Sequence, residues 1–444
     1  MTAGWWGVTI LACGLFLVGV WLGDRASREA TDGPVRGRLI LLLAAALLSR
    51  VALAATIRGY DADIATFSAW AAHAASGLSS FYSPGYFADY PPGYIYLLWL
   101  IGRLQLLLGI DFATPAFLVL LKLPAILADI ATAALFFLIG RRYGNARAAL
   151  VPAALYAFNP AVILDSAVWG QVDSVLTLPI LLGVLLLRNS PAGAGAAFAI
   201  ALLIKPQALI FAPLPLLWFG IRLLRRERQA AADLLLFTGT GLALFCLAIL
   251  PFAARESPSW IISKYGSTLA SYPYASFNAF NLMALTGGNL ADLGQRFFLL
   301  PYGVWGNLFI VLIVLFTLLV MLRGRSLSRL WYAPLFLAAS VFVLSAKMHE
   351  RYLFPALALA LGFYLVSRDR RALLLYAGFT TTLLLNVAQV LVLSQHKIYG
   401  VTPLDPLLLG VSLANLLLWL LLVWIGYQRY LSAAPLDPDQ AASG

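Results

Sequence analysis

Apolar residues follow one another along this chain in long runs, and short polar or basic segments separate the runs. Because about 20 apolar residues span the hydrocarbon core of a bilayer as a helix, runs of this length predict transmembrane helices. The pattern predicts about thirteen spans, at 4–23, 39–57, 117–139, 148–165, 174–188, 192–206, 207–222, 231–253, 301–322, 329–346, 351–367, 372–393 and 406–427. We therefore expect an all-α polytopic membrane protein.

The basic residues are grouped between the apolar runs, for example in 222-RLLRRER-228 and 368-RDRR-371. Loops rich in Lys and Arg stay on the cytoplasmic side of a membrane. Placing the basic clusters there makes the thirteen spans alternate correctly, with the N-terminus outside and the C-terminus inside. A further apolar run at 92–110 would reverse this alternation, so we expect it to be re-entrant or interfacial.

The same pattern predicts one integral membrane domain over residues 1–431. Its first external loop covers about 58–115 and its second about 254–300, and a short cytoplasmic tail follows at 432–444. The spans at 192–206 and 207–222 are short and contain prolines, which predicts broken helices. Broken backbone at membrane depth is tolerated where it lines a cavity or is buried in protein.

Composition and charge narrow the class of protein. Of the 444 residues, 62% are hydrophobic and 11% are charged, and the net charge is +11. Basic loops between spans account for this charge, so no nucleic-acid partner is expected. Cys13 and Cys246 match neither a disulfide framework nor a metal-ligand spacing, and the three histidines lack HExxH-type spacing. No metal site is predicted.

Polar and aromatic segments that are far apart in the sequence all fall on the predicted outer side. They are 59-GYDADIATFSAW-70, 89-DYPPGY-94, 165-DSAVWGQVDS-174, 205-KPQ-207, 273-PYASFNAFNLMAL-285 and 347-KMHERYLFP-355. An ionisable group at the bilayer centre costs about 2.5–3.5 kcal/mol on insertion scales, and such groups usually face a cavity or a partner. One polar site at the outer face would account for all six segments.

The first external loop offers carboxylates beside aromatic residues. If residues 63–77 are helical, Asp63 shares a face with Phe67 and Trp70. Asp63 would then be a catalytic candidate with Asp61 as the alternative, although an aspartate here would also serve as a helix N-cap. Asp89 and Tyr90 end this loop, where Asp89 would either bind a ligand or anchor the chain.

The segment 347-KMHERY-352 gathers charge at the outer end of an apolar run. Lys347, His349 and Arg351 together form a cationic spot suited to a phosphate diester, with Glu350 as an internal counter-ion. A charged, solvated loop is the alternative interpretation. Lys205, in the break between the two short spans, is a further candidate for binding phosphate.

Two other segments suit a sugar. Trp169 offers an aromatic face to the apolar side of a ring, while Gln171 and Asp173 offer groups for its hydroxyls. Asn278 and Asn281 would either hydrogen-bond the same ligand or cap a re-entrant turn.

At these residues the chain resembles the GT-C superfamily of membrane glycosyltransferases, and in particular the bacterial relatives of the GPI mannosyltransferase II family. The resemblance covers about residues 40–400 and rests on 63-DIATFSAWA-71, 89-DYPPGY-94, 169-WGQVDS-174, 205-KPQ-207, 278-NAFNL-282 and 349-HERY-352. It implies a GT-C fold and an inverting, metal-independent reaction in which a loop-one aspartate is the base. It also implies a polyprenyl-phosphate sugar as the donor, with no other cofactor.

The chain is also similar to lipid-linked oligosaccharide glucosyltransferases, whose later loop typically reads His-x-His-Glu-Lys. Here Lys347 stands where the first histidine would be, and Arg351 replaces the lysine. This difference favours plain phosphate binding over a metal or acid role for the loop.

These observations give the functional hypothesis. Asp63 accepts a proton from an acceptor hydroxyl, which attacks the anomeric carbon opposite the lipid phosphate. Mannose is favoured by the resemblance alone, with glucose as the alternative, and the acceptor is a glycan, a lipid or a protein. We expect a multi-pass protein of the plasma membrane with its site on the non-cytoplasmic side. A transporter or flippase for lipid-linked sugars is the rival, although transporter sites tend to lie at the midplane between repeated halves.

Overall fold

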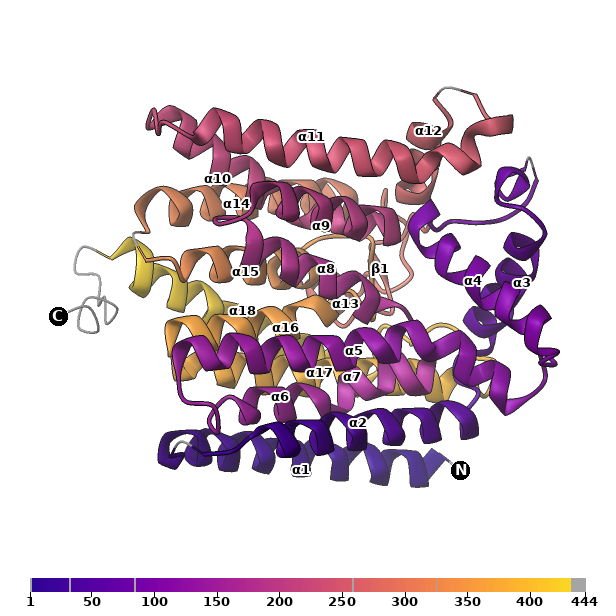
Figure 1. The fold of residues 1–444 in the computed structure, drawn as a ribbon, viewed down its shortest axis with the longest axis horizontal. Helices are drawn as coiled ribbons and strands as arrows, with labels where there is room; N and C mark the ends of the chain where they lie inside the picture. The colour runs from indigo at the N-terminus through magenta and orange to yellow at the C-terminus, as the bar shows by residue number, and fades with distance from the viewer. Residues whose placement is uncertain (1, 32, 84, 258, 325, 433–444) are drawn as a thin grey trace.

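The computed structural model describes residues 2–31, 33–83, 85–257, 259–324 and 326–432. Long helices run side by side in one bundle, and α3 and α4 lie together at one end of it (Figure 1). The bundle contains α1 (Thr2–Glu29), α2 (Arg36–Thr56), α5 (Pro115–Tyr143), α6 (Leu150–Ala157), α7 (Pro160–Ile163), α8 (Asp173–Leu186), α9 (Pro191–Ile204), α10 (Pro213–Leu224), α11 (Ala230–Ile249), α14 (Tyr302–Arg323), α15 (Arg329–Leu344), α16 (Phe354–Ser367), α17 (Arg370–Ser394) and α18 (Pro406–Gly426).

The remaining elements are short or lie outside this bundle. They are α3 (Asp61–Ser76), α4 (Pro92–Leu108), α12 (Trp260–Ala270), α13 (Leu282–Leu285), the irregular helices η1 (Leu78–Ser80), η2 (Leu164–Trp169), η3 (Pro206–Phe211), η4 (Leu250–Arg255) and η5 (Tyr427–Leu431), and the strands β1 (Ser276–Phe277), β2 (Arg296–Phe297), β3 (Leu300–Pro301) and β4 (Met348–His349). The described chain is therefore almost entirely helical, as expected.

A helix occupies each of the thirteen ranges at which a span is expected. Within the described residues, eight helices are long and apolar enough to cross a membrane, or nine if the bent pair Leu150–Ala157 and Pro160–Trp169 is one span. The helices α8, α9, α15 and α16 have only 14 to 16 residues. The structure therefore supports a multi-span membrane protein with eight or nine candidate spans, and the count of thirteen stays a prediction.

The break between α9 and η3 has a local cause. Lys205 has an extended backbone, with φ −148° and ψ 141°, and Pro206 follows it. Proline disfavours helical geometry in the residue before it, so α9 ends at Ile204. The predicted break at Lys205 is therefore confirmed.

Helix α4 has 17 residues and packs closely against α3. A β-carbon on Gly102 would lie 2.2 Å from the carbonyl oxygen of Ala71, so the two backbones approach as only glycine allows. At the other end of α4, a β-carbon on Gly93 would lie 2.7 Å from the carbonyl oxygen of Leu203. These contacts fix α3 and α4 to the bundle next to the break after α9.

Two segments from the second half of the chain meet in a small parallel sheet. Ser276 of β1 pairs with Met348 of β4, and Phe277 pairs with His349. This pairing holds residues 347–352 at the end of the bundle where α3 and α4 lie (Figure 1). It thereby places Glu350 and Arg351 near the first turn of α3.

Candidate active site

The segment after η2 turns sharply and directs two polar side chains inward. Gly170 has φ +92°, in the left-handed region, and a β-carbon there would lie 2.7 Å from Cδ1 of Ile64. Only glycine fits this position without strain. The N–H groups of Gly170 and Gln171 both donate to the carbonyl oxygen of Asp165, at 3.1 and 3.0 Å.

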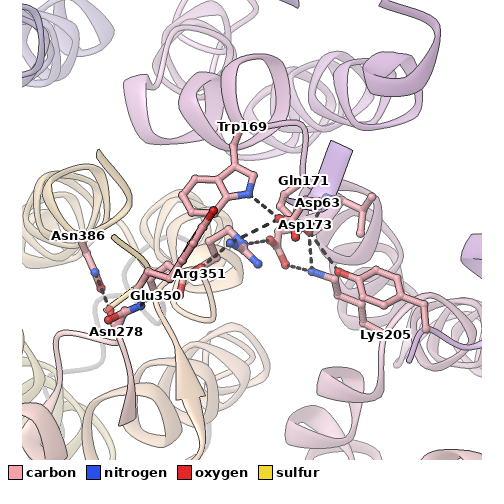
Figure 2. Close-up of polar contacts among 12 residues, drawn as sticks. Asp63, Trp169, Gln171, Asp173, Lys205, Asn278, Glu350, Arg351 and Asn386 are labelled. Atoms are coloured by element: carbon pink, nitrogen blue, oxygen red, sulfur yellow. Dashed lines mark hydrogen bonds and ion pairs between the residues drawn. The ribbon is translucent and has the colours of Figure 1, made fainter. Parts of the chain in front are cut away.

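Asp63, in the first turn of α3, receives hydrogen bonds from this segment. Its Oδ2 accepts from Nε1 of Trp169 at 2.7 Å and from Nε2 of Gln171 at 2.5 Å, as Figure 2 shows. The N-cap of α3 is Tyr60 and no side chain caps the helix. The alternative role of Asp63 as an N-cap is therefore not observed.

Asp61 points away from this cluster. Its carboxylate pairs with Arg58 at 2.7 Å, and its side chain is 79% exposed. By contrast, the side chain of Asp63 is 25% exposed and lines a cavity. The geometry thus favours Asp63 over Asp61 as the carboxylate of the site.

Arg351 lies at the centre of the cluster (Figure 2). Its guanidinium pairs with Glu350, lies 3.6 Å from Oδ2 of Asp173 and 4.0 Å from Oδ2 of Asp63, and stands 4.5 Å from the ring centroid of Trp169. Burial opposes the charged form, but the three carboxylates outweigh it and raise the pKa of Arg351. Arg351 is therefore a permanent cation.

Lys205 supplies a second buried cation from the break after α9. Its Nζ lies 2.8 Å from Oδ1 of Asp173 and 3.4 Å from Oε1 of Gln171. Tyr90 donates its hydroxyl to the same Gln171 oxygen at 3.2 Å. Gln171 therefore joins Lys205, Tyr90 and Asp63 in one network.

The pKa of His349, in the 347–352 segment, is shifted from its ordinary value. Burial, with Arg351 and Lys205, lowers the pKa of His349 to about 3. The imidazole packs against the rings of Phe277 and Tyr352, with centroids 4.8 and 5.0 Å away. A pKa this low indicates a neutral imidazole at pH 7, which argues against the expectation that His349 adds positive charge.

Glu350 is buried and carries the counter-ion role expected for it. Its carboxylate contacts the Arg351 guanidinium. Burial raises the pKa of Glu350, and Arg351 partly offsets that effect. Glu350 also lines the cavity beside Asp63.

Lys347 does not join this cluster. Its Nζ donates to the carbonyl oxygen of Leu269 at 2.9 Å, and its backbone adopts φ +64°. It lines a second cavity that adjoins the first.

Asn278 and Asn281 also lie apart, and internal hydrogen bonds occupy their side chains. Asn278 donates to the carbonyl oxygen of Tyr399 and accepts from the N–H of Val401, at 2.8 and 2.9 Å. Asn281 caps α13 through the N–H of Ala284 and donates to the carbonyl oxygen of Phe342. The capping alternative describes Asn281, and Asn278 instead ties the segment to the loop at Tyr399 and Val401.

The main cavity has a volume of about 270 Å³ and is lined by both polar and aromatic side chains. Its polar lining includes Asp63, Asp89, Gln171, Lys205, Glu350 and Arg351. Trp169 and Asp173 are buried behind this wall. Burial raises the pKa of Asp89, although nearby Lys264 opposes the shift.

The adjoining cavity is larger, about 470 Å³, and more apolar. Its walls come from η3, α12, α14 and α15, with Leu209 and Ile210 on η3. Gln207, Tyr272 and His349 border both cavities. A molecule with a polar head and an apolar tail would thus find both kinds of surface side by side.

Some site residues carry no signal that set them apart in the sequence. Tyr60 stacks on Trp169, with centroids 4.6 Å apart and planes 8° from parallel. Tyr60 and Tyr272 line the main cavity. Their place next to the acidic and cationic segments was the one available signal. Within the described residues, no cluster of three or more His, Cys, Asp or Glu is suited to a metal ion.

A comparison with models of protein families finds a match to part of the chain. Residues 55–275 match the family model described as Oligosaccharyl transferase STT3, N-terminal. A search of curated proteins found no match. The matched segment includes Asp63, Trp169, Gln171, Asp173 and Lys205 and stops before Arg351. The similarity covers just under half of the chain, and it does not extend to the narrower resemblance to GPI mannosyltransferase II relatives.

Proposed function

From the similarity of residues 55–275 to the STT3 N-terminal region, we propose that this chain is an inverting hexosyltransferase. It moves a hexose, with mannose as the first choice, from a polyprenyl-phosphate carrier to a hydroxyl acceptor. The observation that carries the proposal is the Asp63 carboxylate at the cavity wall, fixed by Trp169 and Gln171 beside Arg351.

Asp63 is the general base in this proposal. Both side-chain donors bond Oδ2, and no hydrogen bond to Oδ1 is found in the part of the chain that the structure describes. Oδ1 thus accepts the proton of the acceptor hydroxyl. The hydroxyl oxygen bonds the anomeric carbon as the bond from that carbon to the phosphate oxygen breaks, and the electron pair leaves with the phosphate.

Arg351 and Lys205 stabilise the leaving phosphate. A guanidinium offers a bidentate fork to phosphate oxygens and a lysine acts as a point charge, and fixed charges at a developing anion lower the barrier. In the structure, the guanidinium of Arg351 forms an ion pair with Glu350, so a bound phosphate would compete with Glu350 for it. Because burial raises its pKa, Glu350 is a carboxyl that takes up a proton readily when phosphate competes for that contact.

The adjoining apolar cavity receives the polyprenyl chain. It borders η3, in the broken 192–222 region through which the lipid is expected to enter. Asp89 and Tyr90 line the main cavity and contribute to sugar or acceptor binding together with Trp169, Gln171 and Asp173.

The proposal includes one membrane domain, 1–431, with its site on the non-cytoplasmic side of a plasma membrane. The N-terminal end of α1 lies at the end of the bundle that carries α3 and α4 (Figure 1). The end of α1 and the start of α2, which carry Arg25, Arg28, Arg36 and Arg38, lie at the opposite end. The positive-inside rule supports that orientation.

A lipid-linked oligosaccharide donor is the second candidate, and the similarity to an oligosaccharyl transferase family favours it. Ligand pockets typically measure about 300–1,000 Å³. The main cavity, at about 270 Å³, lies below that range and supports a donor with one sugar. The assay below includes both donors.

The test is sugar transfer in proteoliposomes containing the full chain. Parallel reactions receive polyprenyl-phosphate mannose, polyprenyl-phosphate glucose, or a polyprenyl-linked oligosaccharide, each labelled in the sugar, with a membrane lipid extract and a peptide pool as acceptors. We expect label from the mannose donor in a new product. Label that crosses the membrane unchanged would instead indicate a transporter, and no transfer by folded protein would contradict the proposal.

The reaction is proposed to need no divalent metal, because Arg351 and Lys205 supply fixed positive charge at the cavity. Transfer should therefore stay the same in excess EDTA as in buffer with Mg²⁺ or Mn²⁺. The comparison of initial rates with and without chelator measures this. Loss of transfer in EDTA that either metal restores would show that a metal takes part.

A further inference from the structure

A buried lysine joins the two segments that form the candidate site. Lys122, on α5, is 1% exposed. Its Nζ donates to three backbone carbonyls: Ile57 at 2.7 Å, Ala167 at 3.0 Å and Val168 at 3.1 Å. An ammonium has three donors. All three are therefore used on backbone oxygens, and none on a carboxylate.

The three carbonyl groups to which Lys122 donates lie at the C-terminal ends of two helices. Ile57 is the C-cap of α2, and Ala167 and Val168 precede the last residue of η2. Terminal carbonyls have no partner within their own helix and carry the negative end of the helix dipole. A buried ammonium satisfies them and is stabilised by both dipoles.

The chain continues from each of these helix ends into the site. Three residues beyond Ile57 comes Tyr60, whose N–H donates to the carbonyl oxygen of Trp169 at 3.3 Å. Gly59 between them has φ +96°, and a β-carbon there would lie 2.3 Å from that same oxygen. The backbones of residues 57–60 and of the η2 segment are therefore in contact. This contact lies close to the hydrogen bonds that Trp169 and Gln171 donate to Asp63.

A second side chain on α5, Asp129, forms hydrogen bonds with residues of the η2 segment and the start of α8. Asp129 lies seven residues after Lys122, on the same helix face roughly two turns away. Its carboxylate accepts from Oγ of Ser166 at 2.6 Å and Oγ of Ser174 at 2.5 Å, and it pairs with buried Arg50 at 3.0 Å. Asp129 contacts α2 at Arg50, within the helix, whereas Lys122 contacts Ile57 at its C-terminal end, where the connection to α3 begins.

We propose that Lys122 is a positioning residue that sets the register between the α2–α3 connection and the η2 segment, so that Trp169 and Gln171 meet Oδ2 of Asp63. The expected effect of Lys122 on the transfer rate rests on the proposed function. The register between the two segments is a property of the fold and can be tested without transfer activity. Lys122 lies behind the cavity wall and does not line it.

The test is Lys122→Met in the full chain in lipid nanodiscs, which keeps the length of the side chain and removes its donors. Hydrogen exchange by mass spectrometry is followed for peptides covering 57–63 and 166–172. Transfer kinetics are measured alongside, as kcat and as KM for the donor. Tyr332→Phe is the matched control. It removes one buried hydrogen bond, which the hydroxyl of Tyr332 on α15 donates to the carbonyl oxygen of Leu422 on α18.

We expect faster exchange in both peptides of Lys122→Met, with the rest of the chain unchanged. We also expect kcat to fall roughly tenfold at an unchanged donor KM, less than the ~10²-fold loss that a 1 Å displacement causes. Gly170→Ala pushes on Ile64 and Lys122 and should give the same pattern. It serves as the second variant if Lys122→Met does not fold.

Unchanged exchange in the two peptides would overturn the proposal, as would faster exchange with wild-type kcat. If Tyr332→Phe lowered kcat equally, the effect would be general loss of packing and the proposal would fail. If the wild-type chain shows no transfer, the proposed function fails, and the exchange data alone decide the register: faster exchange in both peptides supports it, and unchanged exchange overturns it.

Discussion

Asp63→Asn is expected to lower sugar transfer by about 10²–10⁴-fold, the range that a general base contributes. Asparagine keeps the shape of the side chain, and its carbonyl oxygen still accepts the bonds that Trp169 and Gln171 donate to Oδ2. It removes the group that takes the proton. Initial rates with labelled donor measure the loss, and binding of the same donor should stay within a few-fold of wild type.

Asp61→Asn is the matched control for this result. It changes the same residue type two positions away, on a side chain that is 79% exposed and paired with Arg58. We expect near wild-type transfer from it. Retained activity in Asp63→Asn together with loss in Asp61→Asn would move the base to Asp61 and contradict the site described above.

The positions of the helices were predictable because apolar runs and helix-breaking residues such as proline can be identified in the sequence. The end of α9 before Pro206 is one example. The number of membrane crossings stays a prediction, because hydrophobicity indicates burial in protein as well as burial in lipid. Helix α15 has 16 residues, and all of them from Leu330 to Leu344 are buried within the protein. Its apolar composition therefore does not show that it crosses a bilayer.

The candidate site was predictable in its membership and less so in its roles. Shared sidedness grouped Asp63, Trp169, Gln171, Lys205 and Arg351, and the structure brings them together (Figure 2). The roles depend on partners that are distant in sequence, which no local pattern reveals. Asn278, for example, bonds Tyr399 and Val401 more than 120 positions later, and this consumes its side chain.

Charge states show the same limit. In the sequence, a histidine near Lys347 and Arg351 reads as part of a cationic spot, yet burial, with Arg351 and Lys205, lowers the pKa of His349 to about 3. Lys122 and Asp129 did leave a signal, since both are charges within the predicted span 117–139. Such charges usually pair inside the bundle or mark function. What they hold was visible only once α2 and η2 were placed against α5.

Arg351→Lys is the second change with a large expected effect. It keeps the positive charge near Glu350, Asp63 and Asp173 and removes the planar fork and its stacking on Trp169. A hydrogen bond to a charged group contributes about 1.5–3 kcal/mol, and each 1.4 kcal/mol is tenfold. Loss of the fork on the leaving phosphate should therefore lower kcat/KM for the donor by about 10²-fold.

Lysine is the informative replacement because a neutral residue would confound stability with function. Removing one partner of a buried charge pair typically destabilises a protein by about 3–5 kcal/mol, and Glu350 and Asp173 would remain buried without Arg351. Lys347→Met provides the comparison, since Lys347 lies four positions away and faces the adjoining cavity. If Arg351 holds the phosphate, the loss should be large in Arg351→Lys and small in Lys347→Met. A large loss in Lys347→Met with little change in Arg351→Lys would place the phosphate in the apolar cavity, because a cation there would then stabilise the leaving group.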